Sequence, residues 1–129
     1  MMSIDQARQL ALALPEAVER DHHGRPSFRV SGRIFATLWT DRAMNVMAGA
    51  DRIRAAAEDQ PGVCSEFFWG KRLAAVQVDL EGVAPGLLED LLDDAWRAKA
   101  PAGLLRETRQ RSASSPEAAA PAAQRRARQ

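Results

Sequence analysis

The chain has 129 residues, with 18 Lys and Arg against 17 Asp and Glu, for a net charge of +1. This length favours one domain, and the near-neutral balance excludes a binding protein that is basic over its whole surface, so any basic face must be local. No apolar run approaches the ~18 residues of a membrane helix. The segment Met1–Asp5 lacks the basic region and apolar core of a signal peptide. We therefore expect a cytoplasmic protein with no membrane partner.

The charge is unevenly distributed along the chain. Residues 106–129 hold six arginines and two glutamates, a net charge of +4, which leaves −3 for residues 1–105. Ala, Ser, Pro, Gln and Arg dominate residues 106–129, so this segment has little apolar surface to offset the entropy lost on ordering. We predict a folded domain over 1–105 and a disordered tail over 106–129.

The first half of the chain predicts a helix followed by strands. Ser3 and Gln6 have the spacing of a capping box, which favours a helix from Ser3 to Ala13. The polar residues 16–24 are expected to be extended. Residues 28–38 predict a hairpin that turns at Ser31-Gly32. A simple two-residue turn would pair Phe28 with Phe35 and Val30 with Arg33.

The second half predicts two more helices and a second hairpin. Residues 43–48 alternate as a strand, and Asp51 can cap a helix that runs to about Asp59. Residues 63–69 and 73–80 form a hairpin around Gly70-Lys71. Pro85 suits the first turn of a final helix, which Pro101 ends. The order α-β-β-β-β-α-β-β-α indicates an α+β fold, with an antiparallel sheet built from hairpins and helices packed on one face.

Several local patterns, in this order and spacing, resemble the MmcQ/YjbR family of small bacterial proteins. They occupy the segments Leu12–Ala17, Asp21–Gly24, Pro26–Ala36, Trp69–Arg72, Val76–Leu80 and Ala95–Arg97. The resemblance covers about residues 1–105 and implies a CyaY-like fold. The family is commonly described as DNA-binding through a pair of winged hairpins. By resemblance, the Ser31-Gly32 and Gly70-Lys71 turns would be the two wings.

Five cations on or near these hairpins are the candidate nucleic-acid-binding residues. They are Arg25, Arg29, Arg33, Lys71 and Arg72. Guanidinium and ammonium groups at exposed hairpin tips can contact phosphates without reading sequence. The competing interpretation is that they are ordinary solvated tips, because cations on edge strands prevent aggregation.

The aromatic residues allow two interpretations. Phe67, Phe68 and Trp69 could stack on exposed bases, but strand alternation turns Phe68 away from its neighbours, and we expect most of the triplet to pack in the core. Trp39 and Trp96 are expected in the core as well. Cys64 is the single cysteine, and we expect it to be a buried structural thiol.

Metal and catalytic sites are only weakly indicated. His22 and His23 are adjacent, and on an extended chain they would point to opposite faces, which disfavours a shared ion. The fold implied by the resemblance has an iron-binding relative that uses acidic side chains, for which the candidates here are Glu89, Asp90, Asp93 and Asp94. No catalytic motif stands out. We expect no enzyme activity and no cofactor.

The sequence therefore predicts a small cytoplasmic protein that binds DNA non-specifically through two basic hairpin tips. The alternatives are a protein-interaction or regulatory module that binds no nucleic acid and, less favoured, an acidic-helix metal-binding protein.

Overall fold

The structure is a computed structural model that describes residues 2–114. The chain divides into two compact units, Met1–Lys99 and Ala100–Gln129, which are described separately. In chain order the elements of the first unit are α1 (Ile4–Leu12), β1 (Val18–His22), β2 (Arg25–Val30), β3 (Arg33–Leu38), β4 (Ala43–Val46), α2 (Ala50–Asp59), β5 (Cys64–Trp69), β6 (Arg72–Asp79) and α3 (Pro85–Lys99).

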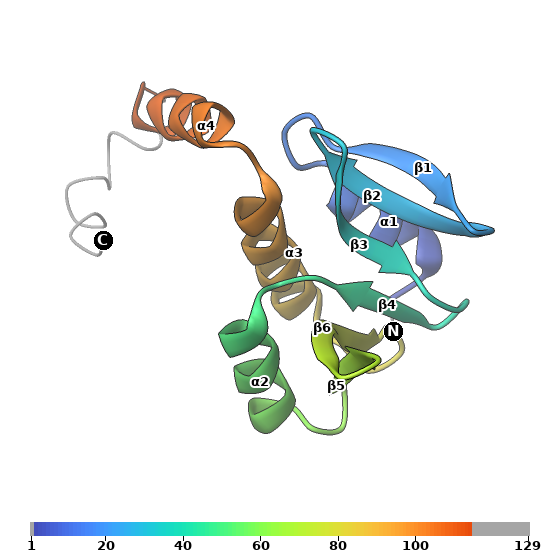
Figure 1. Cartoon of the computed structure of the whole chain (residues 1–129). Coiled ribbons are helices and arrows are strands. Elements are labelled where there is room, and N and C mark those ends of the chain that lie inside the picture. Colours follow the sequence, from blue (N-terminus) through green and yellow to red (C-terminus); the bar gives the residue numbers. More distant parts are fainter. Residues whose placement is uncertain (1, 115–129) are drawn as a thin grey trace. The chain divides into compact units, whose positions relative to one another are not determined.

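The strands of the first unit form one antiparallel sheet in the order β1-β2-β3-β4-β6-β5. Helix α3 packs against β3 and β4, α2 packs against β5 and β6, and α1 packs against α3. In Figure 1, α1 lies behind β2 and β3, and α2 and α3 lie to the left of the strands. One face of the sheet carries no helix of this unit. The predicted α+β fold, with helices on one face of an antiparallel sheet, is confirmed.

The helix starts follow local hydrogen bonding. Ser3 and Gln6 form the predicted capping box, in which the Gln6 amide donates to Ser3 Oγ at 3.1 Å and the Ser3 amide donates to Gln6 Oε1 at 2.8 Å. Asp51, however, is not the cap of α2. Gly49 takes that position with a φ of 91°, and Asp51 lies in the first turn and faces Arg54 at 3.5 Å. The glycine can adopt the left-handed φ that brings the chain out of β4 and into the helix.

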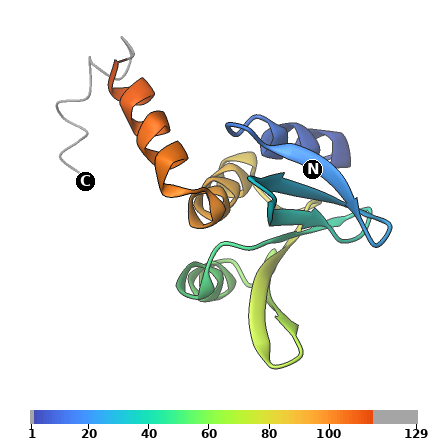
Figure 2. The same cartoon turned by 45° about the horizontal axis from the view of Figure 1, so that its top comes forward.

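Both long hairpins contain a bulge that the sequence did not predict. Val30 pairs with Arg33 as expected, but Phe28 pairs with Ala36 rather than with Phe35. One extra residue on β3 lets both Phe28 and Phe35 be fully buried. The β5–β6 hairpin shifts in the same way between Phe67 and Phe68. Figure 2 shows this hairpin extending away from the rest of the unit.

The core lies between the sheet and the helices. Its largest fully buried side chains are Trp96, Phe28, Phe35, Met44 and Ile53, with leucines of α3 around them. Trp96 is 1% exposed, and its indole nitrogen donates to the Pro15 carbonyl at 2.9 Å. The predictions that Trp96 and Cys64 are buried are confirmed. Trp39 is only half-buried, so its assignment to the core is wrong.

The second unit contains α4 (Ala102–Ser114), so residues 106–114 are helical and the predicted disorder is corrected there. A helix satisfies its backbone hydrogen bonds locally, and Ala, Arg, Gln and Glu favour it without a large apolar face. Residues 115–129 of the predicted tail lie outside the described part of the chain. Within residues 2–114, no helix is both long and apolar enough to cross a membrane.

Candidate nucleic-acid interface

The hairpin turns are set by residues with positive φ. Ser31 and Gly32 have φ values of 50° and 81°, and His23 and Gly24 have 55° and 86°. Two consecutive positive values are the mark of a type I′ turn, which matches the twist of the flanking strands. The third turn begins with Gly70 at a φ of 66°, as a type II′ turn requires.

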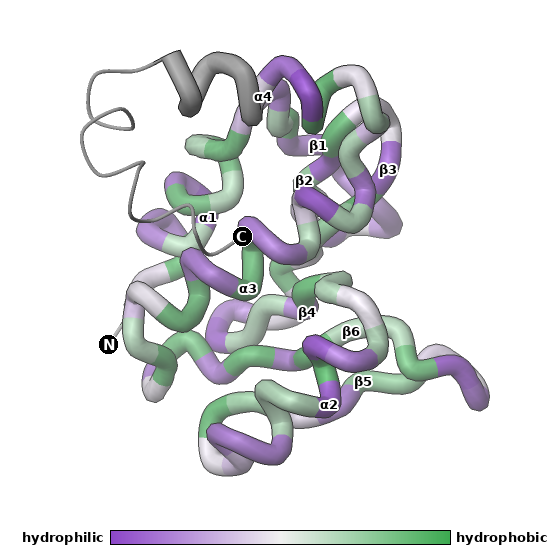
Figure 3. Tube along the Cα trace, turned by 90° about the vertical axis from the view of Figure 1, so that its left-hand side faces the viewer, coloured by the Kyte–Doolittle hydropathy of each residue, from purple (hydrophilic) through white to green (hydrophobic). Residues whose placement is uncertain are grey.

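The two predicted wing turns lie at the same end of the sheet. Strands β3 and β6 each pair antiparallel with β4, so they run in the same direction and begin at the same end. The Ser31-Gly32 turn precedes β3, and the Gly70-Lys71 turn precedes β6. In Figure 3 the β5–β6 hairpin ends in a hydrophilic tip. The side chains that the fold brings beside the β5–β6 tip come instead from the β1–β2 turn, because Trp69 and Arg72 line one pocket with His22, His23 and Arg25.

The five predicted cations are held differently by the fold. Arg25 donates from Nε to the Trp39 carbonyl at 2.9 Å, and its guanidinium lies 4.0 Å from the centre of the Trp39 ring. Arg29 is half-buried and donates from Nε to Ser27 Oγ at 3.2 Å. The remaining three, Arg33, Lys71 and Arg72, are exposed.

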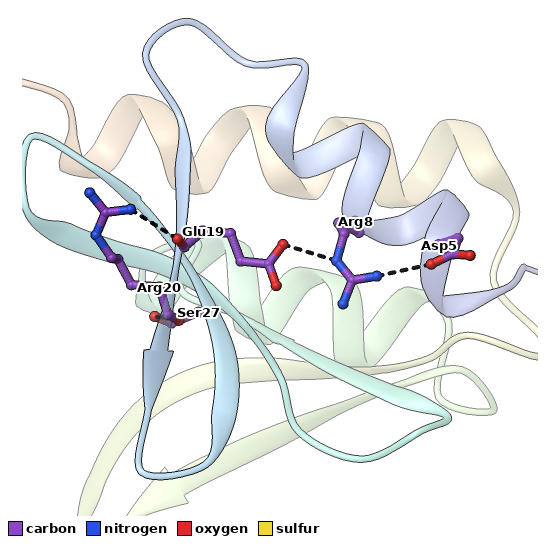
Figure 4. A network of polar contacts seen from close by, with 5 residues as sticks. All are labelled: Asp5, Arg8, Glu19, Arg20 and Ser27. Atoms are coloured by element: carbon purple, nitrogen blue, oxygen red, sulfur yellow. Dashed lines mark hydrogen bonds and ion pairs between the residues drawn. The ribbon is translucent and has the colours of Figure 1, made fainter.

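Among the described residues, none of the five forms an ion pair. Five other arginines do, each with a carboxylate at 3.5 Å or less: Arg8, Arg42, Arg52, Arg54 and Arg97. Figure 4 shows one paired arginine and one unpaired arginine outside the five, Arg8 and Arg20, at the sheet edge. Arg8 lies between Asp5 and Glu19, at 2.9 Å from each, whereas Arg20 on β1 donates only to the Glu19 backbone carbonyl at 3.1 Å. The cations of the hairpins thus keep their charge available, while those listed above are neutralised locally.

A row of polar side chains crosses the helix-free face of the sheet. The strand registers align one polar residue from each strand, namely Arg20, Ser27, Thr37, Asn45, Gln77 and Ser65. Gln77 Nε2 donates to Asn45 Oδ1 at 3.0 Å, and Ser27 Oγ donates to the Arg20 carbonyl at 2.8 Å. Thr37, which is 5% exposed, and Asn45, which is 2% exposed, are buried members of this row. Among the described residues, Thr108 Oγ1 is the only buried side-chain polar atom without a hydrogen-bond partner.

A pocket of about 450 Å³ opens on this same face. Thr37 and Asn45 belong to its lining, together with Trp39, Phe67 and Trp69. The Trp39 and Phe67 rings meet edge to face at 5.1 Å, and Phe67 lies 6.4 Å from Trp69. Sheet twist raises opposite corners of one face, which explains how side chains of distant strands come to surround one hollow. The pocket was not predicted from the sequence, because it depends on that long-range arrangement.

Two arginines border the pocket, and its described lining includes no carboxylate. They are Arg25 and Arg72, and His22 and His23 belong to the lining as well. The site therefore joins two of the predicted phosphate-binding residues to three aromatic rings. Arg29, Arg33 and Lys71 are not part of the lining.

The aromatic triplet differs from the prediction. Phe68 is 50% exposed and Trp69 is 64% exposed, so most of the triplet is outside the core. The strand extends beyond the helices that cover the rest of the sheet, as Figure 2 shows, and burial patterns along a strand cannot reveal where the covering layer ends. Trp69 turns towards the pocket, whereas Phe68 is absent from its lining.

The two histidines also differ from the prediction. His23 leaves the strand with a φ of 55°, and its ring lies 4.5 Å from that of His22. They lie together rather than on opposite faces. Within the part of the chain that the structure describes, no three His, Cys, Asp or Glu side chains are grouped to hold a metal ion. On α3, Asp93 and Asp94 form ion pairs at 2.8 Å with Arg97 and Arg52. Two of the four acidic residues suggested for metal binding are therefore already paired with arginines.

Cys64, at the start of β5, is 2% exposed. Burial raises the pKa of its thiol, an effect that Arg52 partly opposes and Asp59 reinforces. A thiol that is kept protonated is a poor nucleophile. This agrees with a structural role.

Comparison with known proteins agrees with this architecture. Protein DR2400 of Deinococcus radiodurans, whose domain is described as DUF419, has a similar fold, with a TM-score of 0.67 at 19% sequence identity over 80% of this chain and 82% of that one. No protein of curated function matches the chain significantly. The YjbR family model matches residues 12–98, which include every strand of the sheet and nearly all of α3. The chain belongs to the YjbR family.

Proposed function

We propose that the protein binds nucleic acid, contacting the phosphate backbone through the β2–β3 and β5–β6 hairpins without reading duplex sequence. The observation that carries this proposal is that all five candidate cations are without an ion pair, a condition that Arg20 and Lys99 share among the described residues. Arg25, Arg29, Arg33, Lys71 and Arg72 make no ion pair among the described residues, whereas five arginines elsewhere each face a carboxylate. A phosphate can take the place that a carboxylate fills elsewhere.

The net charge of residues 1–105 does not oppose this proposal. At physiological salt, interactions between exposed charges are screened beyond about 8 Å, so a phosphate at a hairpin tip responds mainly to the cations beside it. Four neutralised phosphates would give a salt slope of about −3.6 on duplex DNA. We expect weak binding that salt readily reverses, in the cytoplasm and without catalysis.

A protein partner is the second candidate function. Exposed aromatic side chains are enriched at protein interfaces, and Phe68 and Trp69 are consecutive exposed residues of β5. Such a partner would depend on both rings and would respond less steeply to salt. Salt dependence therefore distinguishes the two candidates.

The test compares two double variants of the full chain that lose the same charge. Arg33→Ala with Lys71→Ala removes one unpaired cation from each hairpin, and Arg42→Ala with Arg54→Ala removes two cations that are already paired. Binding of a labelled duplex is measured by fluorescence anisotropy over a range of salt. The hairpin variant should flatten the salt slope by about 0.9 for each lost contact, on all sequences alike. Equal effects of the two variants, or no binding by the parent at low salt, would refute the proposal.

A further inference from the structure

We propose that the pocket on the helix-free face receives one unpaired nucleobase, so that the protein prefers single-stranded nucleic acid to duplex. This inference rests on the proposed function and specifies its ligand. A base inside a duplex is stacked and paired, and its faces are covered. The pocket can therefore be occupied only by a single strand or by a base turned out of the helix.

The aromatic side chains offer faces on which a base can stack. Trp39 directly follows β3, and Phe67 and Trp69 belong to β5. The centre of the Phe67 ring lies 5.1 Å from that of Trp39 and 6.4 Å from that of Trp69. Trp69 is 64% exposed at the pocket, so one side of its ring lacks protein contacts over much of its area. Stacking on such rings tolerates any base, because every base has a π-face.

Two side chains from the row of polar residues on the helix-free face bring hydrogen-bonding groups to the pocket. Thr37 and Asn45 are 5% and 2% exposed, and both belong to the lining. Asn45 Oδ1 accepts from Gln77, which leaves the Asn45 amide nitrogen, like the Thr37 hydroxyl, without a described protein partner. Neither atom is a buried polar group left unsatisfied, and both belong to residues that line the open pocket. A ligand with both donors and acceptors on its edge, such as a nucleobase, can hydrogen-bond to them there.

The size and charge of the site also fit a nucleotide. Its volume of about 450 Å³ lies in the lower part of the ~300–1,000 Å³ range of small-ligand pockets, which suits one nucleotide and excludes a base pair with its backbone. Arg25 and Arg72 belong to the lining, and the described lining includes no carboxylate. A phosphate that enters beside the base would meet unopposed positive charge.

The test uses the full chain with three probes of equal length: oligothymidylate, a fully abasic single strand, and a duplex. The abasic strand keeps the phosphates and lacks the bases. We expect oligothymidylate to bind at least about fivefold more tightly than the abasic strand, because one stacked base contributes a factor of that size or more. Binding should also quench tryptophan fluorescence. Equal affinity for these two strands would overturn the inference and leave backbone binding intact, whereas no binding of any probe would refute the proposed function itself.

Neighbouring aromatic residues provide a matched pair of variants. Trp69→Ala should remove most of the preference for oligothymidylate over the abasic strand. Phe68→Ala should leave that preference unchanged, because Phe68 is similarly exposed on the same strand but does not line the pocket. Thr37→Val keeps the shape of the floor and should reduce discrimination among the four homopolymers. If Phe68→Ala abolishes the preference and Trp69→Ala does not, the base binds elsewhere and the pocket is not its site.

Discussion

The guanidinium of Arg25 lies 4.0 Å from the centre of the Trp39 ring, and its Nε donates to the backbone carbonyl of the same residue at 2.9 Å. Arg25 is the first residue of β2 and Trp39 directly follows β3, and both line the pocket. The hydrogen bond fixes the guanidinium plane, and the cation–π contact holds it over the ring. One arginine thus orients an aromatic wall and places a positive charge at the same site.

This double role predicts different outcomes for two replacements of Arg25. Arg25→Ala should weaken binding of oligothymidylate and flatten its salt slope by about 0.7, the contribution of one phosphate contact on a single strand. Arg25→Lys should keep the slope and still lose affinity, because an ammonium cannot reproduce the planar stacked contact. Anisotropy titrations at several salt concentrations separate the two effects. Full recovery of affinity with lysine would mean that only charge matters at this position.

Trp96 predicts the largest stability effect in the core. It is 1% exposed and donates to the Pro15 carbonyl, so Trp96→Ala should lower the free energy of unfolding by about 3–5 kcal/mol. Trp96→Phe keeps much of the packing and should cost less. Urea unfolding followed by circular dichroism gives both values. The control is Trp69→Ala, which should stay within about 0.5 kcal/mol because that side chain is largely exposed. Similar losses at the two positions would contradict the assigned core.

Much of the fold followed from local patterns. The Ser3 capping box, Pro85 at the start of α3 and the two-residue turns each act through neighbouring residues, and their effects could be predicted without knowing the tertiary structure. The bulges could not, because the pairing of Phe28 with Ala36 is chosen by the burial of both phenylalanines against distant helices. Helix α4 was not predicted, because residues 106–114 lack the large apolar side chains that a packed helix needs. A helix can nevertheless form from local preferences alone.

The candidate site likewise has one part that local sequence predicts and one part that depends on the tertiary structure. The five hairpin cations stand out in the sequence because they flank turns. The pocket does not, because Thr37, Asn45 and Trp39 become neighbours of Phe67 only through the strand order β3-β4-β6-β5. Trp39 was assigned to the core since tryptophan is usually buried, and sequence alone gave no sign that the helices leave this face open.

Cys64 predicts how stability depends on pH at the alkaline end. Burial raises the pKa of its thiol in the folded state, so the folded protein holds this proton at pH values where the unfolded chain, with a pKa of about 8.5, has released it. The resulting stabilisation is fully present below the unfolded pKa and is lost as pH rises towards the folded pKa. The free energy of unfolding of the parent, measured with urea, should therefore fall above about pH 8.5. Cys64→Ala should make this fall with pH smaller. An identical alkaline decline in both proteins would assign it to other groups.

Deletion of residues 106–129 separates the hairpins from the second source of positive charge. The segment has a net charge of +4, whereas residues 1–105 have −3. If the hairpins bind the backbone through placed cations, the shortened chain should retain binding at low salt with reduced affinity, because the segment adds general attraction to the contacts of the hairpins. Its preference for oligothymidylate over the abasic strand should be unchanged, since the pocket lies entirely within residues 22–75. Thermal unfolding should first establish that the shortened chain is folded, and we expect its midpoint to be almost unchanged. A folded but non-binding shortened chain would transfer nucleic-acid binding to residues 106–129 and favour a protein partner for the hairpins.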